Sequence, residues 1–154
     1  MMNYRSDTTF TYDQHSLDFI LDHLTPGKAI SFCAPSGTGK TTFLCQIIQK
    51  LLSKNNPFSS HDIFVLKMSH HAIDINTQGK DCQKYRDLNV DVFVSNNIEE
   101  ARLYLEQKQQ QQKICLVEGG RRLELPCIVL YREGAHDPNW QSPHQKHILC
   151  QLQL

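Results

Sequence analysis

The chain has 154 residues, of which 40% are hydrophobic, and its sixteen lysines and arginines balance its sixteen aspartates and glutamates. This length and apolar content are typical of one α/β domain with a substantial core. The charge balance shows no basic excess of the kind that nucleic-acid-binding proteins carry, and no apolar run is long enough to span a membrane. We therefore expect no nucleic-acid partner and no membrane partner, and the polar N-terminus, unlike a signal peptide, makes the cytoplasm the expected location.

The first half of the chain alternates helical and extended patterns. Apolar side chains within residues 17–24 are spaced for one face of a helix, which Pro26-Gly27 should end. Residues 29–33 form a short apolar run typical of a strand covered on both faces. Residues 40–53 repeat apolar side chains with a period near 3.6, which predicts an amphipathic helix. Residues 63–66 have the pattern of a second strand.

The second half continues this alternation. Asp81 is placed to cap a helix that runs to about residue 88. Asn97 with Glu100 resembles a capping box and predicts a helix to about residue 108. The expected strands of this half are residues 90–94, 114–117, 127–131 and, as a last edge strand, 150–154. Strands that alternate with helices predict an α/β fold with a mostly parallel sheet flanked by helices.

The loop between the first strand and the second helix carries the clearest chemical pattern. Residues 34–41 read A-P-S-G-T-G-K-T, which fits a phosphate-binding loop (P-loop) with alanine at its first glycine position. Glycines let successive backbone N–H groups turn toward an anion, and the next helix directs its positive end to the same place. Lys40 can reach the β/γ-phosphates, the Thr41 hydroxyl can ligate Mg²⁺, and Thr42 can donate near the α-phosphate. The predicted nucleotide contacts in this loop are Ser36, Gly37, Thr38, Gly39, Lys40, Thr41 and Thr42.

Two charged residues follow predicted strands, Lys67 after residues 63–66 and Glu118 after residues 114–117. Ligands of open parallel sheets bind beyond the carboxyl ends of the strands, so both side chains can point at the nucleotide. Glu118 resembles a Walker-B acid that holds the magnesium shell or orients a water, and its alternative is an ordinary surface carboxylate. For Lys67, a ligand contact and a solvated lysine remain equally open.

Other reactive side chains give weaker signals. The six cysteines form no CxxC pair, and three of them, Cys33, Cys115 and Cys127, lie in apolar runs typical of buried strands, so we expect all six to be reduced. His70-His71 has no acid or cysteine at matching ligand spacing, so a transition-metal site is not expected. No arginine is obviously placed to neutralise the charge of phosphoryl transfer, which predicts weak hydrolysis unless a partner supplies one.

Four segments in a fixed order resemble the molybdopterin-guanine dinucleotide biosynthesis adaptor family, MobB. They read KMSHH at 67–71, DINTQGKDC at 74–82, LVEGGR at 116–121 and PCI at 126–128. The resemblance covers about residues 28–133 and is more specific than the P-loop alone. It implies a P-loop NTPase fold, GTP and Mg²⁺ as cofactors, weak GTPase activity and a homodimer. It also implies a partner, the guanylyltransferase MobA, which attaches GMP to molybdopterin.

The resemblance assigns further site residues. The family's motif positions correspond to Lys67, His71, Asp74, Gly79, Lys80, Asp81, Glu118 and Gly119. Of these, Lys67, His71, Asp74 and Gly119 are expected at the nucleotide. Lys40 and Glu118 are the expected catalytic residues. The expected metal ligands are Thr41, Asp81 and Glu118. The carboxylates of Asp81 and Glu118 are the best placed to meet a magnesium ion held by Thr41.

The chain also departs from the family pattern. Asn76, Gln78, Cys82 and Gly120 stand where an acid, a proline, a serine and an aromatic residue are usual. No guanine-recognition N-K-x-D motif is present, so the choice of GTP rests on the resemblance.

The domain boundaries that we expect are an N-terminal helical extension at 1–27, a nucleotide-binding domain at 28–133 and a C-terminal tail at 134–154.

Two other functions stay open from the sequence. One is a small-molecule kinase or ligase, with Lys67 and Lys80 binding an anionic acceptor. The other is a nucleotide-dependent metallochaperone, for which the histidines are the only hint.

Overall fold

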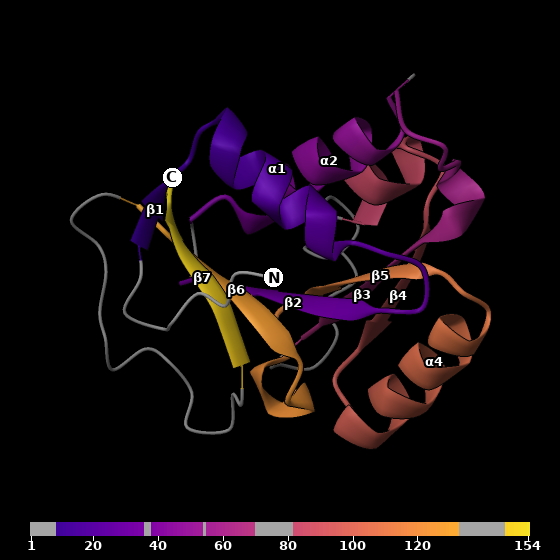
Figure 1. Ribbon diagram of the computed structural model, residues 1–154. Coiled ribbons are helices and arrows are strands. Elements are labelled where there is room, and N and C mark those ends of the chain that lie inside the picture. Colours follow the sequence, from indigo (N-terminus) through magenta and orange to yellow (C-terminus); the bar gives the residue numbers. More distant parts are fainter. Residues whose placement is uncertain (1–8, 36–37, 54, 70–81, 133–146) are drawn as a thin grey trace.

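The computed structural model describes residues 9–35, 38–53, 55–69, 82–132 and 147–154. These residues build a seven-stranded sheet with the strand order β1-β7-β6-β2-β5-β3-β4, in which every pair of neighbours is parallel. The α/β fold with a parallel sheet that the sequence predicts is confirmed (Figure 1). The elements are β1 (Thr9–Thr11), α1 (Gln14–His23), β2 (Ala29–Cys33), α2 (Lys40–Leu51), η1 (Ser60–Asp62), β3 (Ile63–Met68), β4 (Asp91–Ser95), α4 (Ile98–Gln110), β5 (Ile114–Glu118), η2 (Arg121–Leu123), β6 (Pro126–Tyr131) and β7 (His147–Gln153). Residues 82–87 are also helical.

Side-chain caps define where two of the helices begin. Asp13 caps α1 in a reciprocal capping box with Ser16. Asn97 caps α4 as predicted, because its side chain accepts the Glu100 N–H at 3.0 Å. The Glu100 carboxylate accepts a hydrogen bond from the Ser95 hydroxyl. Asn97 therefore provides the cap, and Glu100 ties the first turn of the helix to the end of β4.

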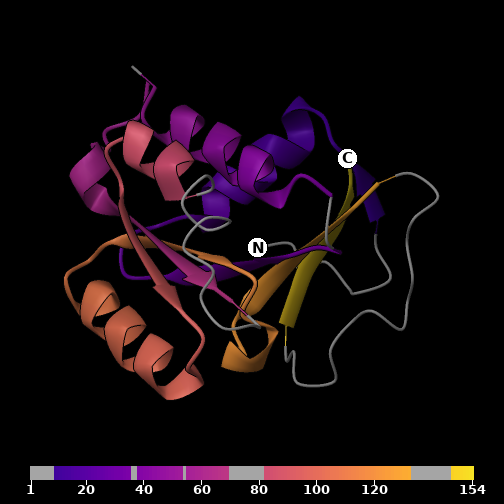
Figure 2. The same cartoon turned by 180° about the vertical axis from the view of Figure 1, so that it is seen from behind.

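Helices cover both faces of the sheet. In Figures 1 and 2, α1 and α2 lie together on one face, and α4 lies on the other. Two buried clusters correspond to these layers, one that joins the α1 and α2 side chains to the sheet and one beneath α4. Strand β5 contributes to both, because Ile114 and Leu116 belong to the first cluster and Cys115 and Val117 to the second. The central strands are therefore buried on both sides, as their apolar runs predict.

Two segments outside residues 28–133 complete one side of the sheet. Residues 147–153 form a strand, as the alternation at 150–154 indicates, but β7 is not an edge strand. Strand β1 pairs with it from Thr9↔Gln151 to Thr11↔Gln153 and takes the edge position. The polar sequence around β1 gave no strand signal, because a three-residue edge strand is too short to show an alternation.

The cysteines are free thiols, and all but Cys45 are buried. Burial in apolar surroundings raises the pKa of both Cys115 and Cys150 to about 12, so these thiols stay protonated at neutral pH. They act as small apolar side chains of the core, as expected from their positions in the strand runs.

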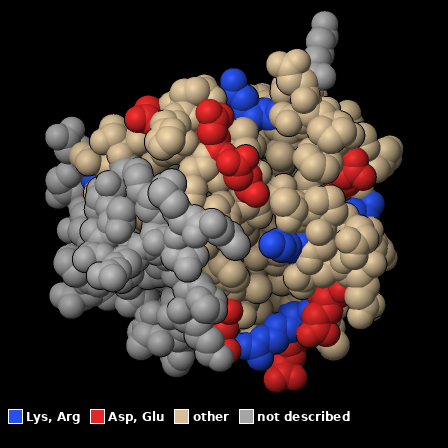
Figure 3. Space-filling model, viewed as in Figure 1, with Lys and Arg blue, Asp and Glu red and all other residues tan. Residues whose placement is uncertain are grey.

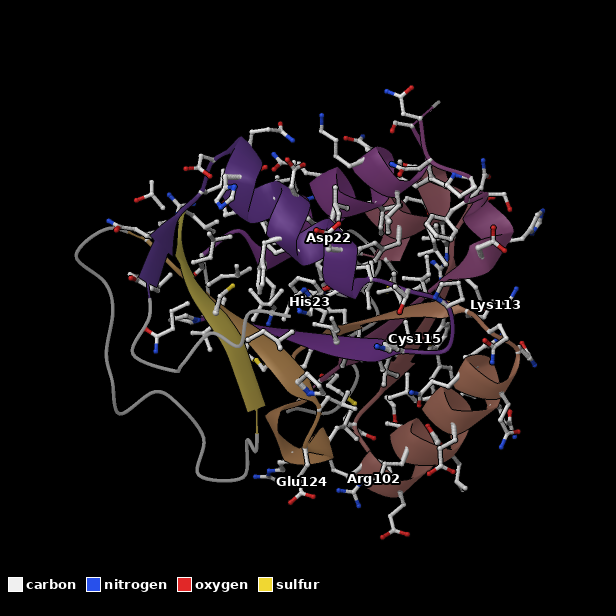
Figure 4. The ribbon with its side chains drawn as sticks, viewed as in Figure 1. Asp22, His23, Arg102, Lys113, Cys115 and Glu124 are labelled. Carbon is white, nitrogen blue, oxygen red and sulfur yellow. The ribbon has the colours of Figure 1, made fainter. Side chains whose placement is uncertain are left out.

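Polar contacts at the surface tie the helices to the ends of the sheet. Arg102 of α4 donates to the Arg122 carbonyl at 3.1 Å, and Lys113, just before β5, donates to the His61 carbonyl. Figure 4 labels Arg102 on α4 and Lys113 before β5. On the face drawn in Figure 3, the acidic and basic side chains of the described residues are interspersed rather than gathered by sign. In the part of the chain that the structure describes, no helix is both long and apolar enough to span a bilayer.

Candidate functional site

The P-loop joins the carboxyl end of β2 to the first residue of α2. Gly39 caps α2 with a left-handed φ of 96° and makes no side-chain hydrogen bond, and the first turn of α2 holds no acidic residue. Thr38 closes a turn just before it, since its N–H and hydroxyl both donate to the Pro35 carbonyl, at 3.2 and 2.7 Å. Backbone N–H groups at the start of a helix have no intrahelical acceptor. Gly39 thus takes the N-cap position without a side-chain acceptor, and among the described residues no side chain accepts from the N–H groups at the amino end of α2.

Glu118 lies beside this loop, as predicted. The strand register pairs Phe32 of β2 and Lys67 of β3 with Glu118 at the end of β5. The Thr41 hydroxyl donates to Glu118 Oε1 at 2.6 Å, and Lys67 Nζ lies 4.0 Å from the same oxygen. The structure therefore brings together Thr41, Lys67 and Glu118, three of the residues that the sequence analysis placed at the nucleotide.

Tyr85 is a site residue that the sequence analysis missed. It lies in the helical residues 82–87 and is fully buried, and its hydroxyl donates to Glu118 Oε2 at 2.5 Å. Burial, and then the negative charge of Glu118, raise the pKa of Tyr85 well above its ordinary value, so the phenol stays protonated and remains a donor. Its spacing of three from Cys82 indicates a core-facing side of that helix, which was the available signal.

The Glu118 carboxylate is buried, with 4% of its surface exposed, and each of its oxygens accepts a short hydrogen bond. Hydrogen bonds to an ionised group are stronger than neutral ones, and a buried charge needs such partners. Lys67 adds a positive charge close by. Together Thr41, Tyr85 and Lys67 hold the Glu118 side chain at a fixed position next to the P-loop.

The described part of the site suits magnesium better than a transition metal. Mg²⁺ prefers oxygen ligands, and the Thr41 hydroxyl and Glu118 carboxylate place two such groups in contact. In the described ranges, three or more histidine, cysteine or acidic side chains do not gather into a metal-binding group. Thr41 and Glu118 are therefore suitable for a magnesium shell.

Arg132 lies beside the P-loop, although no arginine has an obvious place in the sequence for neutralising the charge of phosphoryl transfer. It directly follows β6, and its Nε donates to the Thr38 carbonyl at 3.3 Å. Its Nη2 lies 3.7 Å from the position of a Cβ built on Gly39. Ligands of open parallel sheets bind beyond the carboxyl ends of the strands. A charged residue at such an end is therefore a candidate for ligand contact, and this holds for Arg132 as it does for Lys67 and Glu118.

A cavity of about 560 Å³ opens beside the same loop. Its lining combines the start of α2 with residues that follow β1, β6 and β7. The lining residues are Tyr12, Thr38, Gly39, Thr42, Phe43, Gln46, Arg132 and Leu154. Thr42, predicted near the α-phosphate, is exposed on this side.

The two glycines after Glu118 shape the turn that leaves β5. Gly119 has a φ of 86°, its N–H donates to the Phe32 carbonyl at 3.0 Å, and its carbonyl accepts from the Ser31 hydroxyl. Gly120 has a φ of 80°, and a Cβ there would lie 2.8 Å from Val117 Cγ1. The family's aromatic residue at position 120 therefore cannot occupy this turn as it stands.

We expect Gly120→Ala to lower the free energy of unfolding by about 2–4 kcal/mol, from left-handed strain and overlap with Val117. Gly119→Ala is a matched control, because its φ is similar but its Cβ would make only ordinary contacts, at 3.5 Å. It should cost only the strain, about 1–2 kcal/mol. Urea unfolding of both variants measures the difference, and equal losses would contradict the overlap.

Some predicted site residues lie outside the described residues. They are Ser36, Gly37, His71, Asp74, Gly79, Lys80 and Asp81. Lys40, in contrast, is described as the half-buried first residue of α2.

Comparisons with known proteins agree with the resemblance. A family model described as "Molybdopterin guanine dinucleotide synthesis protein B", MobB, matches residues 29–151. A protein of Escherichia coli (strain K12) named molybdopterin-guanine dinucleotide biosynthesis adapter protein is 28% identical over 136 residues, which cover 79% of this chain and 75% of that protein. A protein of the same name from Haemophilus influenzae (strain ATCC 51907 / DSM 11121 / KW20 / Rd) is 28% identical over 116 residues, which cover 67% of this chain and 62% of that protein. Because the family match runs from the first residue of β2 into β7, across the P-loop and Glu118, the chain belongs to the MobB family.

Proposed function

We propose that this protein is a GTP-binding adapter in the synthesis of molybdopterin guanine dinucleotide, with at most a weak GTPase activity. The contact that carries the proposal is the 2.6 Å hydrogen bond between Thr41 and Glu118, which places a buried carboxylate beside the P-loop. The family membership and the names of the two relatives support the pathway.

The residues of the loop suggest how the triphosphate would be held. The uncapped amino end of α2 offers N–H groups to the phosphates, and Lys40 supplies a countercharge at its first position. Thr41 and Glu118 would hold the magnesium ion, which neutralises phosphate charge when it is bound. Arg132, on the opposite side of the loop, places a second cation beside the P-loop, where its Nε donates to the Thr38 carbonyl.

Weak hydrolysis is consistent with the state of Glu118. Both of its oxygens already accept hydrogen bonds, from Thr41 and Tyr85, and Lys67 lies 4.0 Å away. A carboxylate whose two oxygens both accept hydrogen bonds is better suited to hold a metal shell than to take a proton from water. Binding with slow turnover is the behaviour that an adapter requires.

The partners belong to the proposal as well. A MobA-type guanylyltransferase and molybdopterin follow from the family, and a cytoplasmic location follows from such a biosynthetic role.

A homodimer is also proposed. Among the described residues, β4 is the edge strand on one side of the sheet and carries half-buried Val92, Phe93 and Val94. Such a strand edge can pair with another chain.

The direct test is reconstitution. A MobA-type guanylyltransferase, molybdopterin and Mg-GTP are incubated with and without this protein, and formation of molybdopterin guanine dinucleotide is measured. We expect the wild-type protein to bind the enzyme and to increase product formation, and Lys40→Ala to lose the increase. If the wild-type protein neither binds the enzyme nor changes its rate, the adapter role is wrong.

A further inference from the structure

The cavity beside the P-loop lies on the side away from Glu118. Strands β5 and β3 flank β2 on one side and carry Glu118 and Lys67, whereas β6, β7 and β1 follow on the other. Arg132, Leu154 and Tyr12, which directly follow those three strands, line the cavity. The cavity therefore adjoins the phosphate loop without sharing the proposed magnesium position.

We propose that this cavity holds the nucleoside half of the bound nucleotide, with the Tyr12 ring as the surface on which the base stacks. The inference rests on the proposed nucleotide binding. If the terminal phosphates lie toward Lys40 and Thr41, beside Glu118, and the α-phosphate lies near Thr42, then the ribose and base continue past Thr42. Thr42 lines the cavity, whose volume of about 560 Å³ suits a ligand of this size.

Tyr12 is held in place but keeps part of its surface open. Its N–H donates to the Gln153 carbonyl at 2.8 Å, and its hydroxyl donates to Gln46 Oε1 at 3.2 Å. Its ring meets Phe43 edge-to-face with centroids 5.5 Å apart, yet 36% of the residue is exposed. A fixed and partly exposed aromatic ring is a good platform for a base, because little side-chain freedom remains to be lost on binding.

The polar groups of the cavity favour guanine over adenine. Arg132 uses Nε on the Thr38 carbonyl, so its other N–H groups can donate to a ligand. Gln46 Oε1 already accepts one hydrogen bond from Tyr12, and the Gln46 amide N–H₂ is a second donor. Guanine presents two acceptors, O6 and N7, to such donors, whereas adenine presents an amino donor in place of O6. The cavity thus supplies a basis for base choice in a chain without an N-K-x-D motif.

Two residues that line this cavity lie outside the part of the chain that the family model matches. The family model matches residues 29–151, and both Tyr12 and Leu154 fall beyond it. These residues reach the loop because β1 pairs with β7 and β7 with β6, and because the Leu154 N–H donates to the Tyr131 carbonyl at 2.8 Å. The segments that flank the family match therefore have a role at the site in addition to completing the sheet.

The test compares ligands with and without a base. Titration calorimetry measures the affinities of Mg-GTP, Mg-ATP and Mg-tripolyphosphate for the wild type, Tyr12→Ala and Lys40→Ala. Leu103→Ala, at an exposed position on α4, is the surface control. We expect Tyr12→Ala to weaken Mg-GTP roughly 5- to 150-fold, the range that loss of base stacking gives, and to leave Mg-tripolyphosphate unchanged. Lys40→Ala should weaken all three ligands, and Leu103→Ala none.

The outcomes separate this inference from the proposed function. Equal weakening of Mg-GTP and Mg-tripolyphosphate by Tyr12→Ala would overturn the stacking role, and so would an unchanged affinity for Mg-GTP. In the wild type we expect Mg-GTP to bind more tightly than Mg-ATP, and Arg132→Met to reduce that preference. Equal affinities in the wild type would overturn the assignment of the cavity donors to guanine. If the wild type binds none of the three ligands, the proposed function fails, and this inference with it.

Discussion

In the presence of Mg-GTP at about a hundred times its Kd, the wild-type protein should melt about 5–10 °C higher than without nucleotide, and Lys40→Ala should show no such shift. A ligand at that excess stabilises the fold by roughly 2.7 kcal/mol, which for a domain of this size corresponds to that increase in Tm. Lys40 starts α2 next to uncapped N–H groups, so its removal takes the countercharge from the phosphates without touching the buried core.

Differential scanning fluorimetry with and without Mg-GTP measures the effect. Lys50→Ala is a matched control, because Lys50 is an exposed lysine in the last turn of the same helix, far in sequence from the P-loop. It should keep the full shift. A shift of equal size in Lys40→Ala and the wild type would contradict the assignment of Lys40 to the phosphates.

Replacing Glu118 with glutamine should lower the free energy of unfolding by about 1.5–3 kcal/mol, the value of a hydrogen bond to a charged group. The amide nitrogen cannot accept, so either the Thr41 or the Tyr85 hydroxyl loses its acceptor in a buried site. The Lys67 ammonium loses its partner charge at 4.0 Å. The same change should reduce the gain from magnesium, so that Mg-GTP stabilises Glu118→Gln little more than GTP does in the presence of a chelator.

A double-mutant cycle with Tyr85→Phe isolates the contact to Tyr85. Because the two groups are in direct contact, their effects on stability should not add. Tyr104→Phe serves as the control, since the Tyr104 ring stacks on Phe93 and its hydroxyl makes no hydrogen bond to the described residues. Additive effects of Glu118→Gln and Tyr85→Phe, or unchanged nucleotide hydrolysis in Glu118→Gln, would contradict the role given to this carboxylate.

The parallel sheet could be predicted because its central strands are short apolar runs between helices with clear periodicity. Residues 29–33 and 114–117, for example, correspond closely to β2 and β5, and the Asn97 cap of α4 was visible in the sequence. Strand β1 was not predictable, because its three residues gain their structure from pairing with β7. That pairing is a long-range contact, and no local pattern encodes it.

The candidate site, like the fold, could be predicted from the sequence only in part. Glu118 and Thr41 could be placed together because a P-loop and the end of a neighbouring buried strand meet at one edge of a parallel sheet. Tyr85 and Tyr12 were missed because their roles depend on packing between elements distant in sequence, with Glu118 in one case and with Gln46 and Phe43 in the other. Arg132 directly follows the predicted strand at 127–131, so its position at the same edge of the sheet could have been predicted in the same way.

Gly120 illustrates a departure from a family pattern that the structure explains. The sequence shows only that a glycine replaces an aromatic residue. The structure adds a left-handed φ of 80° and a close approach to Val117 and Leu123, so the turn after β5 is built around a residue without a side chain. The left-handed conformation of this turn therefore explains why a glycine stands at position 120 in place of the aromatic residue.

The binding of a guanine nucleotide at the P-loop can be examined in a crystal structure of the protein grown with Mg²⁺ and a non-hydrolysable GTP analogue. We expect the phosphates at the amino end of α2 against Lys40, the metal beside Thr41 and Glu118, and the base against Tyr12. Electron density for the analogue elsewhere on the protein, or none at the start of α2 at saturating concentration, would contradict this expectation.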